Sequence, residues 1–137
     1  MIHVKCYTDA AVDGNPGNGG VGIVVQGEEV YEQLNFPLDG QWDNHLAEFE
    51  AVFLALQWLI DHQYNNEFLF LHTDSKIVAD SLNKSYAKRP TFNDYVQKIA
   101  TLQNQFSLIE YRWIPESQNR GADNLARQAL QKVIKSK

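Results

Sequence analysis

The fold is decided by residues 2–36, which read IHVKCYTDAAVDGNPGNGGVGIVVQGEEVYEQLNF. Apolar and polar side chains alternate through Ile2–Thr8, which is the pattern of a strand with one buried face. Val21–Gln26 and Val30–Phe36 have the composition of two further strands, and a short glycine-containing turn separates them. The glycine-rich residues 13–20 between the first two strands predict a turn. We therefore expect three antiparallel strands that follow one another along the chain.

After residue 40, apolar residues recur at every third or fourth position instead of at every second position. His45–Ile60 keeps this spacing without Gly or Pro, which predicts an amphipathic helix with Asp43 or Asn44 as its N-cap. The remaining segments alternate between the two patterns: strands at Glu67–His72 and Phe106–Ile114, and helices at Ile77–Leu82, Pro90–Gln103 and Ala122–Ile134. The sequence therefore predicts an α/β fold in one domain, residues 1–137, with three antiparallel and then two parallel strands in one mixed sheet, and helices on both faces.

The bulk composition indicates a cytoplasmic protein. Cys6 is the single cysteine, so the chain forms no internal disulfide and suits a reducing compartment. The longest nearly apolar stretch, Ala51–Ile60, contains Gln57 and is about half the length of a membrane span. The first residues lack the apolar core of a signal peptide. We expect no membrane partner and no obligate protein partner.

Four acidic residues fall where the predicted elements begin or end. Asp9 and Asp74 follow predicted strands, Glu48 lies near the start of a helix, and Asp123 opens the last helix. In open α/β sheets such positions converge at one edge, and carboxylate oxygens are the ligands that Mg²⁺ prefers. Taken singly, each acid is better explained as a turn residue or as a helix-dipole partner than as a metal ligand. Glu50 also competes with Glu48, because two residues along a helix turn by about 200° and both cannot face one metal ion.

The local sequence around these acids resembles the ribonuclease H type 1 family. The similar segments are Tyr7–Gly17 (YTDAAVDGNPG), Asn44–Ala51 (NHLAEFEA), Leu71–Ser75 (LHTDS) and Asn119–Ala126 (NRGADNLA), in the family's order. The resemblance implies a ribonuclease H-like fold and an enzyme that hydrolyses the RNA strand of RNA/DNA hybrids to 5′-phosphate and 3′-hydroxyl products. It implies that the catalytic and metal-binding residues are Asp9, Glu48 (in preference to Glu50), Asp74 and Asp123, with two Mg²⁺ or Mn²⁺ ions. It also implies that Asn15, Asn44, Ser75 and Arg120 contact the hybrid.

The chain departs from the family pattern at several positions. The loop Pro115–Gly121 contains no His, which places the chain in the branch that lacks the active-site loop His and leaves Arg120 as the available cation. Position 45 is His where a second Asn is usual, and Lys84–Arg89 has three cations but no Trp. The formal net charge of −5 at pH 7 is also unusual for a nucleic-acid binder. Two alternatives stay open: a weakly active or non-catalytic nucleic-acid-binding module, and a nuclease for another RNA substrate.

Overall fold

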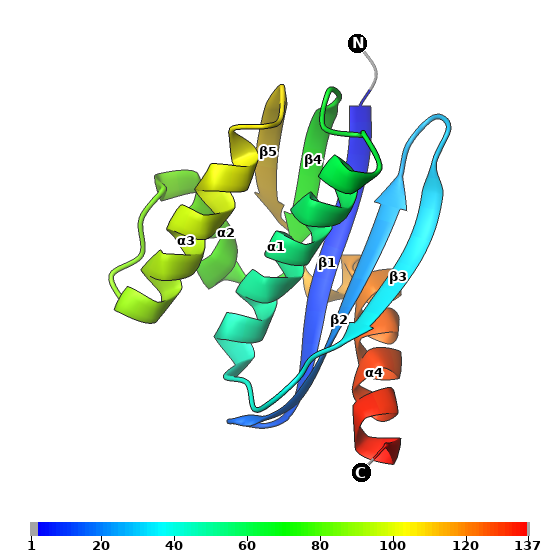
Figure 1. Cartoon of the computed structure of the whole chain (residues 1–137), viewed down its shortest axis with the longest axis vertical. Coiled ribbons are helices and arrows are strands. Elements are labelled where there is room, and N and C mark those ends of the chain that lie inside the picture. Colours follow the sequence, from blue (N-terminus) through cyan, green and yellow to red (C-terminus); the bar gives the residue numbers. More distant parts are fainter. Residues whose placement is uncertain (1–2, 137) are drawn as a thin grey trace.

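A computed structural model describes residues 3–136. Its sheet has the order β3-β2-β1-β4-β5 (Figure 1). The strands are β1 (His3–Gly14), β2 (Gly17–Gln26), β3 (Tyr31–Pro37), β4 (Phe68–Thr73) and β5 (Leu108–Trp113). β2 pairs antiparallel with β1 and β3, whereas β4 pairs parallel with β1 and β5. This confirms the predicted mixed sheet; of the predicted first strand, Ile2 lies outside the described residues.

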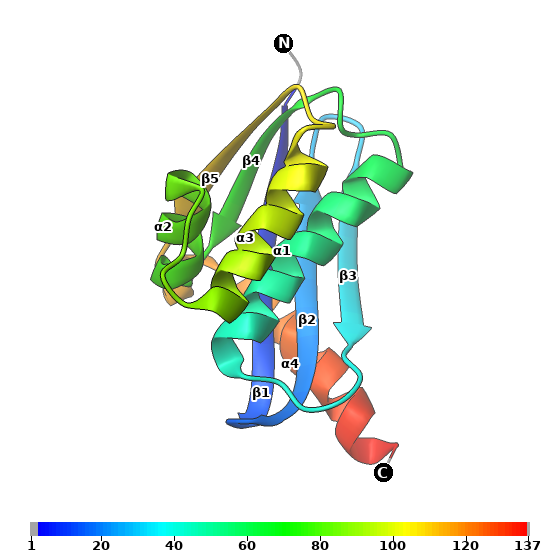
Figure 2. The same ribbon diagram turned by 60° about the vertical axis from the view of Figure 1, so that its left-hand side comes forward.

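Helices cover both faces of the sheet, as predicted (Figures 1 and 2). They are α1 (Asn44–Asp61), α2 (Lys76–Lys84), α3 (Pro90–Gln103) and α4 (Arg120–Lys135), with a 3-10 turn, η1, at Glu116–Gln118. α1 packs on β1 and β2, and α3 packs on α1. α4 packs on β1, β2 and β3 from the opposite face of the sheet. Within residues 3–136, no helix is both long enough and apolar enough to cross a bilayer.

The prediction of a turn over residues 13–20 is wrong for most of that segment. β1 continues to Gly14 and β2 starts at Gly17, so only Asn15 and Pro16 connect them. Gly20 and the neighbouring Gly22 serve helix packing instead: a Cβ on Gly20 would lie 2.4 Å from the backbone nitrogen of Leu130, and one on Gly22 would lie 2.1 Å from the backbone oxygen of Ala122, both in α4. Because β1 continues to Gly14, Asp9 lies inside this strand. The prediction that Asp9 follows the first strand is therefore also wrong.

Gly22→Ala is expected to lower the free energy of unfolding by about 3 kcal/mol, because α4 must move away from β2 to admit a methyl group. Urea denaturation measures the change. Gly121→Ala at the same interface is the matched control, since its Cβ would meet only the Val24 side chain, at 3.3 Å. The control should stay within about 1 kcal/mol of wild type. Equal stabilities for the two variants would contradict this account of the β2–α4 contact.

Candidate active site

Asp9, Glu48 and Asp74 come together at one point of the sheet. One carboxylate oxygen from each lies within 4.8 Å of the others. The register explains two of them, because the parallel pairing of β1 with β4 ends at Thr8 and Thr73, and each aspartate is the next residue. Glu48 reaches the same point from α1, which packs on β1. The predicted convergence is therefore confirmed in geometry for these three acids, which we call the acid cluster.

The acid cluster is largely shielded from water. Asp9 is 6% exposed and Glu48 is 8% exposed. Burial, together with the charge of Asp74, raises the pKa of Asp9 to about 7, although the backbone N–H of Ala10 donates to its Oδ1 at 2.9 Å. Burial and the charge of Asp9 raise the pKa of Glu48 well above its ordinary value, and burial raises the pKa of Asp74. Three neighbouring carboxylates with raised pKa values need either protons or a cation, and a hard divalent metal ion fits this donor set.

Asp123 lies at the margin of the acid cluster. It is in the first turn of α4, and its charge helps to raise the pKa of both Asp9 and Asp74. Its Oδ1 accepts a hydrogen bond from Nε of Arg127 at 3.1 Å, and the side chain is 36% exposed. The structure therefore brings Asp123 near the cluster but pairs it with a cation four residues along the same helix.

Glu50 is directed to a different partner from Glu48. The hydroxyl of Tyr95 in α3 donates a hydrogen bond to Oε1 of Glu50 at 3.0 Å. Glu48 faces the acid cluster instead. The spacing of apolar residues in the helix did not distinguish Glu48 from Glu50. The packing of α3 on α1 explains why Glu50 bonds to Tyr95 and not to the acid cluster.

A groove of about 560 Å³ lies beside the acid cluster. Glu48 and Asp74 line it, together with Asn44, Ser75 and Trp113.

Two of these residues also have structural partners: the backbone N–H of Asn44 donates to Oδ1 of Asn15 at 3.1 Å, and the backbone N–H of Val78 donates to Oγ of Ser75 at 3.3 Å. The first bond ties the β1–β2 turn to the start of α1. The helix cap itself is Asp43, whose Oδ2 accepts from the N–H of Leu46 at 3.1 Å.

Arg120 and His45 occupy different surroundings. Arg120 is exposed at the first position of α4, and it is absent from the described residues that line the groove. His45 lines the groove, and its ring lies edge-on to Phe92 with centroids 5.7 Å apart. The groove therefore contains the histidine that replaces the family's usual Asn but not the predicted loop cation.

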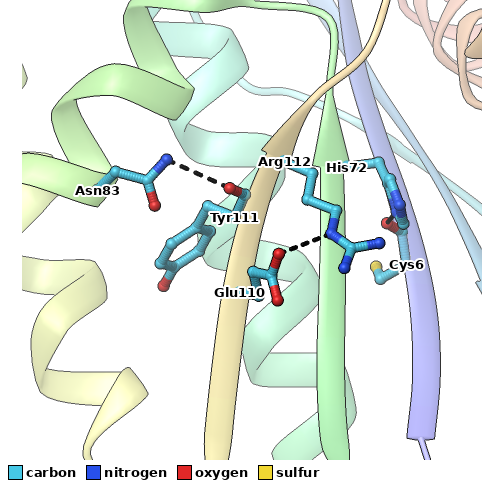
Figure 3. A network of polar contacts seen from close by, with 6 residues as sticks. All are labelled: Cys6, His72, Asn83, Glu110, Tyr111 and Arg112. Carbon is cyan, nitrogen blue, oxygen red and sulfur yellow. Dashed lines mark hydrogen bonds and ion pairs between the residues drawn. The ribbon is translucent and has the colours of Figure 1, made fainter.

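His72 on β4 and Arg112 on β5 are opposite each other in the sheet, and each makes its own polar contact outside the acid cluster (Figure 3). Nδ1 of His72 is 3.1 Å from the backbone oxygen of Cys6, and its ring stacks on Tyr7. Burial lowers the pKa of His72, which favours the neutral ring. Nε of Arg112 donates to Oε1 of Glu110 at 2.8 Å. These contacts give both residues a structural role in the sheet.

Asn119 lies beside the acid cluster, although the sequence motifs indicated no role for it in the site. It is 1% exposed, and its Nδ2 donates to the backbone oxygen of Thr8 at 2.9 Å and to Oδ2 of Asp74 at 3.2 Å. An Asn before a helix is typical of an N-cap, but this side chain makes no capping hydrogen bond. Only the tertiary structure shows that it links β1 to the Asp74 carboxylate.

Comparison with known proteins identifies the family. A protein-family model described as reverse transcriptase-like matches residues 7–129. The chain belongs to the reverse transcriptase-like family. EbsB of Enterococcus faecalis, which is provisionally named as a hydrolase, is 43% identical to this reverse transcriptase-like chain over 134 residues, and the match covers 98% of both proteins.

Relatives of this reverse transcriptase-like chain include ribonucleases H. Ribonuclease H of Trichodesmium erythraeum is 29% identical over 147 residues, covering 95% of this chain and 90% of that protein. A solved structure of LC11-RNase H1, an enzyme isolated from compost by a metagenomic approach, contains an RNA/DNA hybrid. That structure superposes with a TM-score of 0.87 at 26% identity and covers 96% of this chain and 99% of its own. The family is therefore ribonuclease H-like, as the four motifs indicated.

Proposed function

We propose that this protein is a metal-dependent endoribonuclease that hydrolyses the RNA strand of RNA/DNA hybrids to 5′-phosphate and 3′-hydroxyl products. The observation that carries the proposal is the acid cluster, in which three carboxylates from β1, α1 and the end of β4 lie within 4.8 Å of one another. Relatives named ribonuclease H support the choice of reaction, and the hybrid bound to LC11-RNase H1 supports the choice of substrate.

Two Mg²⁺ or Mn²⁺ ions are the cofactors in this proposal. Asp9, Glu48 and Asp74 would hold one ion, and Asp9 and Asp123 the other. When bound, the ions supply the positive charge that activates a water molecule and stabilises the leaving oxygen of the scissile phosphate. The side chains of Asp9, Glu48 and Asp74 fix where that charge lies. Asp123 extends the ligand set toward the α4 side of the site.

The groove beside the acid cluster is the proposed substrate channel. Asn44 and Ser75 line it, and Asn15 bonds to the backbone of Asn44. These polar groups suit the 2′-hydroxyls in the wide minor groove of a hybrid, which distinguish RNA from DNA without reading the base sequence. Arg120 does not line the groove, and it would contact the hybrid from its exposed position at the start of α4. We propose that one domain, residues 1–137, carries the activity in the cytoplasm without an obligate protein partner.

A substrate panel tests the proposal. Four labelled duplexes or strands of one sequence (an RNA/DNA hybrid, duplex RNA, duplex DNA and single-stranded RNA) are incubated with the protein in Mg²⁺, Mn²⁺ or EDTA. We expect cleavage of the RNA strand of the hybrid in either metal and none in EDTA. Binding of the hybrid without cleavage in millimolar Mn²⁺ would identify a non-catalytic binding module. Faster cleavage of duplex RNA would identify a different substrate.

Asn119→Ala is expected to weaken Mn²⁺ binding by about 10- to 100-fold, because residues that orient a metal ligand usually have effects of this size. The substitution removes both hydrogen bonds of Nδ2 and leaves the Asp74 carboxylate free to rotate. Isothermal titration calorimetry with Mn²⁺ measures the affinity. Asn124→Ala, at an exposed position of α4, the helix that follows Asn119, is the control. Wild-type affinity in Asn119→Ala would refute a positioning role.

A further inference from the structure

Trp113 is an exposed tryptophan within the groove. It is the last residue of β5 and is 51% exposed, although tryptophan is usually well buried. The other two tryptophans, Trp42 and Trp58, are half-buried and pack against the hydrophobic core. An exposed aromatic ring inside a groove is a common feature of binding sites, where one face of the ring is left for a ligand.

The ring of Trp113 is held in place by the residue that supplies one of the acids. Its Nε1 donates to the backbone oxygen of Asp74 at 3.1 Å. The indole N–H is therefore satisfied within the protein, and the ring is fixed relative to the Asp74 backbone. A group packed on the indole would lie next to the acid cluster.

Ile77 adds a second apolar group to the groove. It lies in the first turn of α2, is 42% exposed, and lines the groove with Trp113. α2 contacts β5, as Figure 2 illustrates. The other side chains of the groove include the amide of Asn44 and the ammonium of Lys76. The groove thus offers an apolar wall beside polar groups suited to phosphate and hydroxyl oxygens.

We propose that Trp113 and Ile77 pack against the sugar of the nucleotide whose phosphate lies at the acid cluster. This inference rests on the proposed function. A sugar is covalently attached to that phosphate, so it is the part of the substrate that lies nearest to the indole. The bases of a hybrid are stacked and paired, whereas the sugars are open along the wide minor groove. The carbon-rich side of the sugar matches the apolar wall, and its oxygens match Asn44 and Lys76.

The first arm of the test measures affinity. Binding of a labelled RNA/DNA hybrid is followed by fluorescence anisotropy in Ca²⁺, a hard cation that takes the same oxygen ligands. Trp113→Ala is expected to raise Kd about 10-fold or more, as for other aromatic residues at the centre of an interface. Trp113→Phe retains a ring and should stay within about 3-fold of wild type. Trp58→Phe, which lies outside the groove, is the matched control.

The second arm uses the tryptophan as its own reporter and needs no change at position 113. In the double variant Trp42→Phe, Trp58→Phe, all tryptophan emission comes from Trp113. Saturation with the hybrid should change its intensity or wavelength, because the sugar displaces water from the indole face. This arm keeps the proposal testable if Trp113→Ala fails to fold.

The outcomes separate this inference from the proposed function. If the wild-type protein binds the hybrid but neither Trp113→Ala nor the emission responds, the sugar contact is refuted and the proposed function stands. If the wild-type protein does not bind the hybrid, both fall. A Trp113→Ala effect on single-stranded RNA alone would mean that the ring stacks on a base, which would overturn the sugar assignment.

Discussion

Glu48→Gln is expected to reduce the rate of hybrid cleavage by at least about 1,000-fold, whereas Glu50→Gln should leave it within about 3-fold of wild type. The two substitutions are chemically identical and lie two residues apart on α1. Glu48 is in the acid cluster, so its amide analogue removes a charge that the proposed metal site requires. Glu50 accepts a hydrogen bond from Tyr95, and a Gln side chain retains an acceptor there. Initial rates on a labelled hybrid in Mg²⁺ measure both effects.

Melting curves monitored by circular dichroism serve as the control for this pair, because both variants must be folded at the assay temperature. Equal losses of activity in two folded variants would show that helix α1 contributes in some way other than through the acid cluster. Full activity in Glu48→Gln would remove Glu48 from the proposed metal site.

Asp9→Asn is expected to stabilise the metal-free protein at pH 8 by about 1–3 kcal/mol, although it should abolish cleavage. In the folded protein the pKa of Asp9 is raised from 3.8 to about 7. A group with a raised pKa contributes its full stability below its unfolded pKa and loses it as the pH rises through its folded pKa. The wild-type protein should therefore lose this contribution between about pH 4 and pH 7. The neutral Asn side chain never carries the charge and avoids the loss.

Urea denaturation in EDTA at several pH values measures this effect as the difference between Asp9→Asn and wild type. The difference should grow from pH 4 to pH 7 and then level off. Asp80→Asn, at an exposed position of α2, is the control and should show no such trend. Added Mg²⁺ at pH 8 should stabilise the wild-type protein more than Asp9→Asn, since a ligand that binds only the folded state raises its stability. A less stable Asp9→Asn at pH 8 would contradict the raised pKa.

The strand and helix order could be predicted because apolar periodicity depends only on which face of each element is buried. The meander, the long helix and the alternation that follows all appear where the side-chain pattern indicated. Residues 13–20 were misinterpreted because local sequence does not tell a glycine needed for a turn from one needed for close packing. Gly20 faces the backbone of α4 at Ala126 and Leu130, more than 100 residues further along the chain.

The acid cluster could be predicted in part. Motifs indicated Asp9, Glu48 and Asp74, and the end of the parallel pairing at Thr8 and Thr73 explains why the two aspartates meet. Asn119 begins one of the four motifs and Trp113 lies in a predicted strand, but the sequence assigned neither a role in the site, because their roles depend on hydrogen bonds to Asp74 across the sheet. The roles of the four acids in catalysis, and of Asn15, Asn44, Ser75 and Arg120 in substrate binding, stay predictions.

The acidic net charge is compatible with a nucleic-acid substrate because acidic and basic side chains are unevenly distributed over the protein. Part of it comes from the acid cluster, which a bound cation would neutralise. Lys84, Lys88 and Arg89 line a second hollow, which shares Ile77 with the groove beside the acid cluster. Basic side chains are thus gathered next to the proposed substrate channel, although the chain as a whole is acidic.

A crystal structure of the wild-type protein grown in millimolar Mn²⁺, with anomalous diffraction measured at the manganese edge, would show whether the acid cluster binds metal. We expect an anomalous peak from a manganese ion coordinated by the carboxylates of Asp9, Glu48 and Asp74, and the loss of that peak in Asp9→Asn crystals grown under the same conditions. A wild-type map without a peak among these three carboxylates, or an equal peak in Asp9→Asn, would contradict it.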